Sequence, residues 1–156
     1  MKTEALFNAI RNGEKNVIET LLKADPNLLN TKDQRGSTPL LLATYYGDID
    51  VTKAILAHNP DVNAKDTSGN TALMGVCFKG FTEIAALLIN SGANVNLVNG
   101  NNATALIYAA TFGRSKIVKI LLENGADRSM KDSRGHTAYD HAKMQGTHEI
   151  IALLEA

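Results

Sequence analysis

Residues 33–40 of the chain read Asp33-Gln34-Arg35-Gly36-Ser37-Thr38-Pro39-Leu40. Asp followed three residues later by Gly is typical of a tight turn, because Asp bonds to the backbone ahead of it and Gly adopts a positive φ. Thr38 is a suitable helix N-cap, and proline is tolerated in the first turn that follows. The segment therefore predicts a turn that leads into a short helix, which runs from Thr38 to Tyr46.

The same pattern returns every 33 residues along the chain. The positions that share this spacing are Asp33, Asp66, Asn99 and Asp132; Thr38, Thr71, Thr104 and Thr137; and Gly47, Gly80, Gly113 and Gly146. A further copy lies upstream at a spacing of 34, where Leu6, Ala9 and Gly13 match Leu40, Ala43 and Gly47. After each of these glycines, apolar residues recur at helical spacing, which predicts a second helix in every unit. A period of this length indicates a stacked array of similar units.

The repeated units resemble ankyrin repeats. The resemblance is carried by residues 33–40 and by Gly92-Ala93-Asn94-Val95-Asn96 and Gly125-Ala126-Asp127. It implies an all-α repeat solenoid, an ankyrin-repeat stack of antiparallel helix pairs linked by β-hairpin fingers, over a single domain at 1–156. The expected units are an N-terminal cap repeat at 1–32, internal repeats at 33–65, 66–98 and 99–131, and a C-terminal cap repeat at 132–156. The resemblance also implies a binding role and no catalytic one.

Two asparagines stand where the family pattern has glycine. Asn59 occupies the end of a second helix, and Asn102 takes the place of the turn glycine in its unit. Asparagine tolerates the left-handed conformation better than other residues with a side chain. We therefore expect both residues to have positive φ.

Composition narrows the classes of function. The 16 Lys and Arg residues balance 16 Asp and Glu residues, so the chain as a whole is no general polyanion binder, although a local basic patch is compatible with this balance. A hydrophobic content of 44% argues against intrinsic disorder. There is no apolar run of membrane-spanning length and no apolar leader at the start, and the single Cys77 is in keeping with a reducing compartment. We expect a monomeric, cytoplasmic protein.

Candidate chemical groups are few. Cys77 aligns with Thr44 and Ala110 inside a first helix, so we expect a buried structural thiol. His136, Asp140 and His141 lie close together in sequence, but their spacing is not that of a zinc motif. The sequence therefore predicts no catalytic residue, no metal and no cofactor, and thus no enzyme.

Gly75 interrupts a short helix, where glycine costs about 1 kcal/mol relative to alanine. Its equivalents in the other units are Leu42, Tyr108 and His141. One interpretation is steric, in which Gly75 makes room for a bulky neighbour such as Tyr108. The other is a small notch in the binding face. The sequence leaves both open.

The resemblance places partner binding on the fingertips and on the exposed ends of the first helices. The residues predicted to bind a partner are Arg11, Arg35, Tyr45, Tyr46, Phe78, Lys79, Asn101, Thr111, Phe112, Arg134 and Met144. Four of these are aromatic, and aromatic residues commonly anchor interfaces. The charged residues projected onto this face are all basic, so the expected partner is a protein with an acidic surface. The alternative is a nucleic acid or another polyanion bound by the same face.

Overall fold

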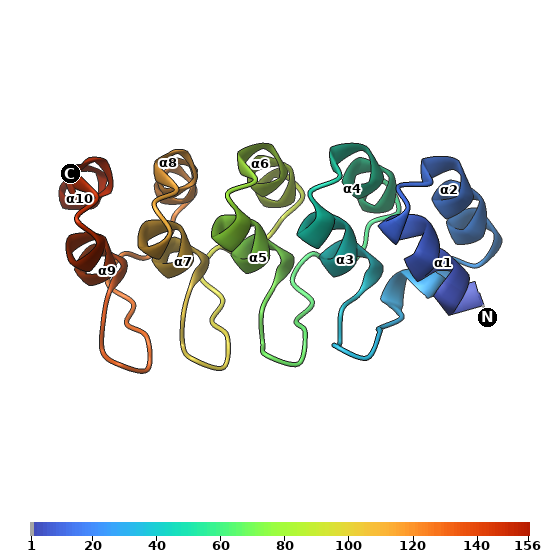
Figure 1. Ribbon diagram of the computed structural model, residues 1–156, viewed down its shortest axis with the longest axis horizontal. Coiled ribbons are helices and arrows are strands. Elements are labelled where there is room, and N and C mark those ends of the chain that lie inside the picture. The colour runs from blue at the N-terminus through green and yellow to red at the C-terminus, as the bar shows by residue number, and fades with distance from the viewer. Residues whose placement is uncertain (1) are drawn as a thin grey trace.

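The computed structural model describes residues 2–156, which form a row of antiparallel helix pairs (Figure 1). The helices are α1 Lys2–Arg11, α2 Lys15–Ala24, the 3-10 helix η1 Pro26–Asn30, α3 Pro39–Tyr46, α4 Ile49–Leu56, α5 Ala72–Lys79, α6 Thr82–Asn90, α7 Ala105–Thr111, α8 Ser115–Glu123, α9 Ala138–Gln145 and α10 His148–Glu155. The first helix of each pair packs against the first helix of the next pair, and the second helices form a parallel row behind a shared core. The predicted all-α repeat solenoid is confirmed.

The core is built from the same positions in each unit. Leu40, Leu73 and Leu106 are at most 2% exposed, and they lie in consecutive first helices. Ile55 and Leu88 in the second helices are fully buried as well. Burial of a side chain of this size stabilises the fold by about 1.5–3 kcal/mol, so the stack gains stability from every unit that is added to it.

The threonine N-caps are present as predicted. The hydroxyl oxygen of Thr38 accepts a hydrogen bond from the backbone N–H of Leu41 at 3.2 Å. Thr71, Thr104 and Thr137 cap α5, α7 and α9 in the same way. The two asparagines also have the predicted positive φ, 55° at Asn59 and 57° at Asn102.

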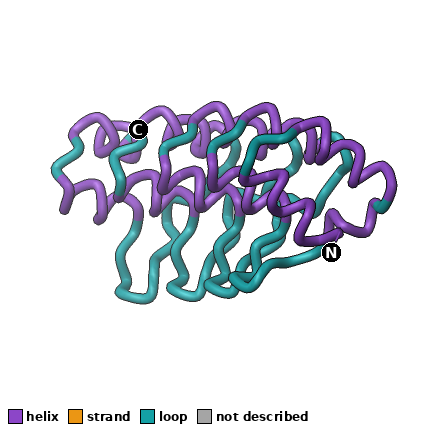
Figure 2. The backbone as a smooth tube through the Cα atoms, turned by 45° about the vertical axis from the view of Figure 1, so that its right-hand side comes forward, coloured by secondary structure: helices purple, strands orange, loops and turns teal. Residues whose placement is uncertain are grey.

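Each finger is a loop held by one side chain. Oδ1 of Asp33 accepts hydrogen bonds from the backbone N–H groups of Arg35 and Ser37, both at 2.9 Å. Asp66, Asn99 and Asp132 do the same in their own fingers. Figure 2 shows that the fingers project from the helices on one side of the array and are drawn as loops. Residues 2–156 contain no β-strand, so the predicted β-structure of the fingers is not confirmed.

Neighbouring fingers are linked by backbone hydrogen bonds that do not extend into a ladder. The N–H of Thr67 donates to the carbonyl of Arg35 at 3.2 Å, and the N–H of Gly100 donates to the carbonyl of Ser68 at 3.0 Å. These are single bonds at the fingertips, whereas a β-ladder needs a series of regularly spaced bonds. The fingers are therefore cross-linked without becoming a sheet.

One close approach joins two neighbouring units, and one arginine binds the C-terminal end of the last helix. Gly47, with φ of 70°, lies so close to the Phe81 ring that a Cβ at this position would be 2.8 Å from it. At the far end of the chain, the Arg128 guanidinium donates to the carbonyl oxygens of Leu154 and Ala156, both at 2.8 Å. The carbonyl of Leu154, which has no partner within α10, is satisfied in this way.

The helices of residues 2–156 are too short and too polar for any of them to cross a membrane.

Deletion of residues 132–156 should destabilise the protein strongly. Ile117 and Leu121 of α8 are fully buried, and the removed α10 packs against that helix. The truncated protein should therefore unfold at a lower temperature with reduced cooperativity, or aggregate. Thermal unfolding followed by circular dichroism measures this. An unchanged midpoint and an equally sharp transition would contradict the stacked core.

Candidate functional site

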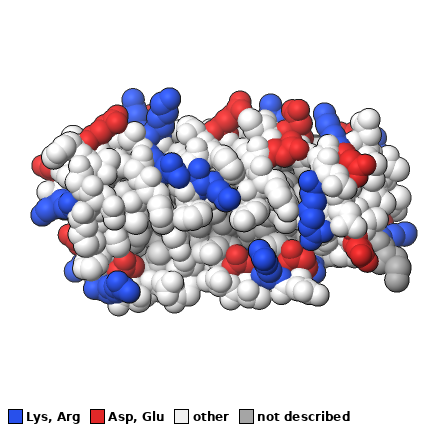
Figure 3. Space-filling view, in the orientation of Figure 1, with Lys and Arg blue, Asp and Glu red and all other residues white. Residues whose placement is uncertain are grey.

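An open groove runs along the first three units, between the first helices and the fingers. Its volume is about 1310 Å³, and its walls come from α1, α3 and α5, from the fingers at 33–37 and 66–70, and from Tyr108 of α7. In Figure 3, charged side chains of both signs lie along the edge over the second helices and along the edge over the fingers, and uncharged residues fill most of the band between them. The groove joins segments that are far apart in sequence, so it is the main candidate for a binding site.

Three aromatic side chains line the groove in an exposed position. Tyr45 and Tyr46 at the end of α3 are 52% and 50% exposed, and Phe78 at the end of α5 is 46% exposed. The rings of Tyr45 and Tyr46 meet edge to face, with centroids 5.5 Å apart. Because Leu and Ile already fill the core, these rings contribute apolar area that remains available to a partner.

Basic side chains accompany the aromatic ones. Arg11, Arg35 and Lys79 all line the groove. Lys79 Nζ lies 4.3 Å from the centroid of the Tyr45 ring, a cation–π contact that holds the amine beside the ring. The groove therefore offers apolar and cationic groups side by side.

The charge of the groove is nevertheless mixed. Glu4, Asp33 and Asp66 line it together with the basic residues. The sequence positions had placed only basic residues on this face, and the second helices carry both signs at the surface. The expectation that the charged residues of this face are all basic is therefore wrong for the groove. Asp33 and Asp66 each use one carboxylate oxygen for two backbone N–H groups of their own finger.

Two lysines at the finger bases have a structural role. Lys32 Nζ donates to the carbonyl of Lys65 at 3.2 Å, and Lys65 Nζ donates to the carbonyl of Val98 at 2.7 Å. Each of these bonds joins one unit to the next. These bonds between units account for a basic residue at this position without any role in partner binding.

The groove brings together six of the eleven predicted binding residues. These six are Arg11, Arg35, Tyr45, Tyr46, Phe78 and Lys79. The other five, Asn101, Thr111, Phe112, Arg134 and Met144, lie in the last two units outside its lining. Phe112 is linked to the groove indirectly, because its ring packs edge to face on Phe78 with centroids 4.7 Å apart.

A polar network next to the groove was missed by the sequence analysis. Nδ2 of Asn99 donates to Oδ1 of Asn70 and to the hydroxyl of Tyr108, both at 2.8 Å. Asn99 is only 7% exposed, so the network ties two fingers and a helix together away from water. The available signal was the repeat register, since Tyr108 lies one turn before Phe112 and thus on the same face of α7.

The steric interpretation of Gly75 is wrong. A Cβ added to this residue would meet no atom within 4 Å, apart from its chain neighbours and its own helix backbone. Gly75 is exposed and lines the groove. No neighbour such as Tyr108 requires glycine at this position.

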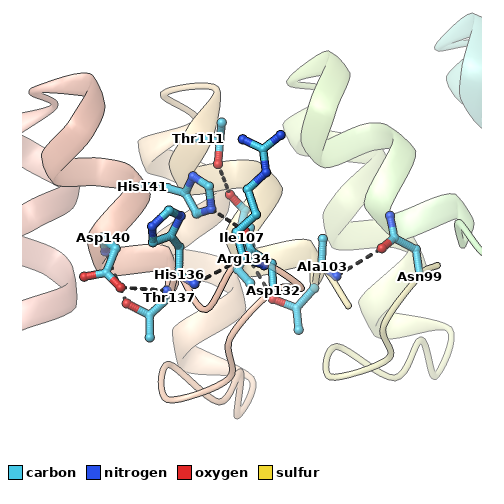
Figure 4. Close-up of polar contacts among 11 residues, drawn as sticks. Asn99, Ala103, Ile107, Thr111, Asp132, Arg134, His136, Thr137, Asp140 and His141 are labelled. Carbon is cyan, nitrogen blue, oxygen red and sulfur yellow. Dashed lines mark hydrogen bonds and ion pairs between the residues drawn. The ribbon is translucent and has the colours of Figure 1, made fainter. Parts of the chain in front are cut away.

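The last finger holds the one group of possible metal ligands found among residues 2–156. Ligand atoms of Asp132, His136 and His141 lie within 4.8 Å of one another. Asp140, which the sequence analysis grouped with the two histidines, instead forms a capping box with Thr137 (Figure 4). His141 Nε2 and Asp132 Oδ2 are already hydrogen-bonded at 2.6 Å. Asn99 and Tyr108 make the same connection one unit earlier, so we assign the Asp132–His141 pair a structural role.

The environment of Asp132 favours its ionised form. Partial burial acts against ionisation, but hydrogen bonds from the backbone N–H of His136, from His141 and from the backbone N–H of Arg134 together lower the pKa of Asp132 below 3.8. The pKa values of Asp127 and Asp140 are also lowered, by the hydrogen bonds that Ser129 and Thr137 donate. None of these carboxylates has the raised pKa of a general acid.

Cys77 is fully buried in α5, as predicted. Burial raises the pKa of its thiol, so the reactive thiolate is disfavoured. The residue packs as part of the core.

Tyr46→Ala should change the free energy of unfolding by no more than about 1 kcal/mol, because half of the side chain is exposed. Leu73→Ala, in the buried face of the neighbouring helix, should cost about 2–5 kcal/mol. Urea unfolding followed by circular dichroism measures both values. A loss at Tyr46 as large as that at Leu73 would show that the ring belongs to the core.

Asp132→Asn should reduce the sensitivity of the fold to acid. Since the pKa of Asp132 is lower in the folded than in the unfolded chain, its carboxylate stabilises the fold above about pH 4. This contribution is lost as the pH falls from there through the folded-state pKa. The drop in melting temperature between pH 7 and pH 3 should therefore be smaller in Asp132→Asn than in the wild type, and asparagine still holds the finger as Asn99 does. Asp50→Asn, on the exposed surface of α4, is the control, and an equal drop in all three proteins would contradict the assignment.

The repeat geometry agrees with the comparison to known proteins. No curated protein matches the chain. A family model described as ankyrin repeats (3 copies) matches residues 6–99, 46–132 and 73–155, and these matches together span most of the sequence. With the period of 33 residues, the paired helices and the fingers, this match shows that the chain belongs to the ankyrin-repeat family.

Proposed function

We propose that this protein is a non-enzymatic interaction module that holds a segment of a protein partner in the groove of its first three units. Ankyrin repeats are generally protein–protein interaction modules. The observation that carries the proposal for this chain is the set of half-exposed rings of Tyr45, Tyr46 and Phe78 along one groove. Exposed aromatic side chains at the centre of a concave surface are typical anchors of a protein interface.

The partner segment that we propose is acidic and also carries apolar side chains. Arg11 and Arg35 are exposed along the groove, and Lys79 is held beside the Tyr45 ring. Of the acidic groups in the lining, Asp33 and Asp66 are partly engaged inside their own fingers. With Arg11, Lys32, Arg35 and Lys79 against Glu4, Asp33 and Asp66, the lining has a small excess of cationic groups, which favours carboxylates on the partner.

A nucleic acid or another polyanion is the second candidate for the same groove. Aromatic rings beside cations can stack with bases and pair with phosphates. Against it stand the three acidic residues in the lining and the balanced charge of the chain, since phosphate binding depends on neutralisation by many basic groups. The protein partner is therefore the better supported of the two.

We also propose that this protein has no catalytic activity. The ankyrin fold is typically non-catalytic. The one thiol, Cys77, is buried, and Asp132 and His141 are hydrogen-bonded to each other in the last unit, away from the groove. We further propose that the protein acts as a monomer in the cytoplasm, where a reduced thiol such as that of Cys77 is the rule.

Replacing the groove residues should weaken partner binding and leave the fold intact. Proteins captured from lysate by the wild type, with and without nuclease, supply the partner, which mass spectrometry identifies. Tyr46→Ala should weaken its binding by about 2 kcal/mol or more if the ring is an anchor. Arg35→Glu should act mainly on the association rate, and this rate should depend less on salt than in the wild type. Biolayer interferometry measures both effects.

The matched controls lie on the second helices. Asp50 in α4 and Glu123 in α8 are exposed and outside the groove, so reversing either charge should leave binding unchanged. If these reversals weaken binding while Tyr46→Ala and Arg35→Glu do not, the groove is the wrong surface. Capture that is lost after nuclease treatment would support the nucleic-acid alternative.

A further inference from the structure

We infer that Gly75 forms a notch in the floor of the groove that receives one large apolar side chain of the partner, next to a partner carboxylate. This inference rests on the proposed function, because it assumes that the groove binds a protein segment. It goes further in naming the chemistry of that segment and the residue that selects it.

The repeat register places Gly75 between two large side chains. Leu42, Gly75 and Tyr108 are equivalent residues of α3, α5 and α7, and all three line the groove. These helices pack side by side, α3 against α5 and α5 against α7. The side chain that the other two units provide is therefore missing at Gly75, and a Cβ built there meets no neighbouring atom within 4 Å.

Neither packing nor backbone conformation requires glycine at this position. A Cβ at Gly75 would meet nothing within 4 Å, whereas a Cβ at Gly47 would lie 2.8 Å from the Phe81 ring and one at Gly80 would lie 2.9 Å from the Arg114 side chain. Gly47 and Gly80 also have positive φ, and Gly75 does not. Glycine weakens a helix relative to almost any other residue. At Gly75 neither close packing nor a positive φ offsets this loss of helix stability. The one property that glycine supplies here is therefore open space.

The surroundings of the gap define its ligand. Phe78, which is 46% exposed, provides apolar surface in this groove, and the largely buried Leu42 and Met74 also line it. Tyr108 is held in place because its hydroxyl accepts a hydrogen bond from Asn99 and its ring stacks on Phe112, with centroids 6.3 Å apart. A side chain that enters this gap meets surfaces that are already ordered, which lowers the entropic cost of binding.

The charges beside the gap specify what flanks the apolar side chain. Lys79 follows Gly75 by one helical turn and therefore lies on the same face of α5. Arg35 of the preceding finger lines the same groove. A Leu, Met or Phe of the partner inserted at Gly75 thus brings its neighbouring residues toward two cationic groups. The preferred motif is one such apolar residue adjacent to Asp or Glu.

The test is a selection from a library of random peptides displayed on phage, with the full-length wild-type protein as the target. The recovered peptides are synthesised, and fluorescence anisotropy gives their affinities for the wild type and for Gly75→Ala, Gly75→Leu, Tyr46→Ala and Ala152→Leu. Gly75→Leu fills the gap. Ala152→Leu adds similar bulk at an exposed position of α10 and is the matched control.

Peptides with Leu, Met or Phe beside Asp or Glu should predominate. Gly75→Leu should weaken their binding by about 30-fold or more, as loss of an interface hot spot does. Ala152→Leu should leave their binding unchanged. Gly75→Ala should raise the melting temperature by about 2–4 °C, since alanine is the better helix former. Gly75→Leu should melt no lower than the wild type, and this result separates loss of binding from loss of folding.

The remaining outcomes distinguish this inference from the proposed function. If Tyr46→Ala weakens peptide binding and Gly75→Leu does not, the groove binds peptides and the notch is overturned. If neither variant affects the recovered peptides, both conclusions fall. Three other results would overturn the proposed occupant. Recovered peptides that lack the apolar and acidic motif would point to a partner of different chemistry. Displacement of the peptides by single-stranded DNA alone would point to a nucleic acid, and a dimer of the protein that Gly75→Leu dissociates would point to a second copy of this chain.

Discussion

No helix pair of this protein can bury its apolar side chains without a neighbour. Leu73 of α5 is almost completely buried, and α5 packs against α3 on one side and α7 on the other. Because each helix pair is covered by the pairs before and after it in the chain, the pairs form a linear array instead of a globule. All first helices therefore have the same orientation in the array. The groove is a consequence of this arrangement, because the exposed ends of those helices and the fingers face the same open space.

Much of the fold was predictable from the sequence because the interactions that determine it are local. Thr38 caps α3 through a residue three positions ahead, and Asp33 closes its finger through residues two and four positions ahead. Such contacts repeat wherever the residues repeat. The β-structure expected in the fingers is not confirmed. The backbone bonds within a finger, such as those from Asp33 N–H to the Ser37 carbonyl and from Gly36 N–H to the Asp33 carbonyl, close a turn and do not continue as a ladder.

The binding surface was predictable only in part. The register correctly predicted that Tyr45, Tyr46 and Phe78 are exposed, since Leu and Ile fill the inward positions. It could not show that the groove lies mainly in the first three units, with Tyr108 as the lining residue from the fourth, and that it excludes Met144. Side-chain contacts between units also escaped it, such as the bond from the Lys65 amine to the backbone carbonyl of Val98, because they depend on side-chain rotamers and on how the units are placed in space.

The Asp132–His141 hydrogen bond makes the two ends of the array differ in their sensitivity to acid. This bond belongs to the last unit, whereas the groove lies in the first three. Since each unit is supported by its neighbours, loosening that begins in the last unit must pass through α7 and α8 before it reaches the groove. Acid strong enough to protonate Asp132, below about pH 4, should thus fray the protein from its C-terminal end inward. The part that fails first is the part farthest from the surface that would hold a partner.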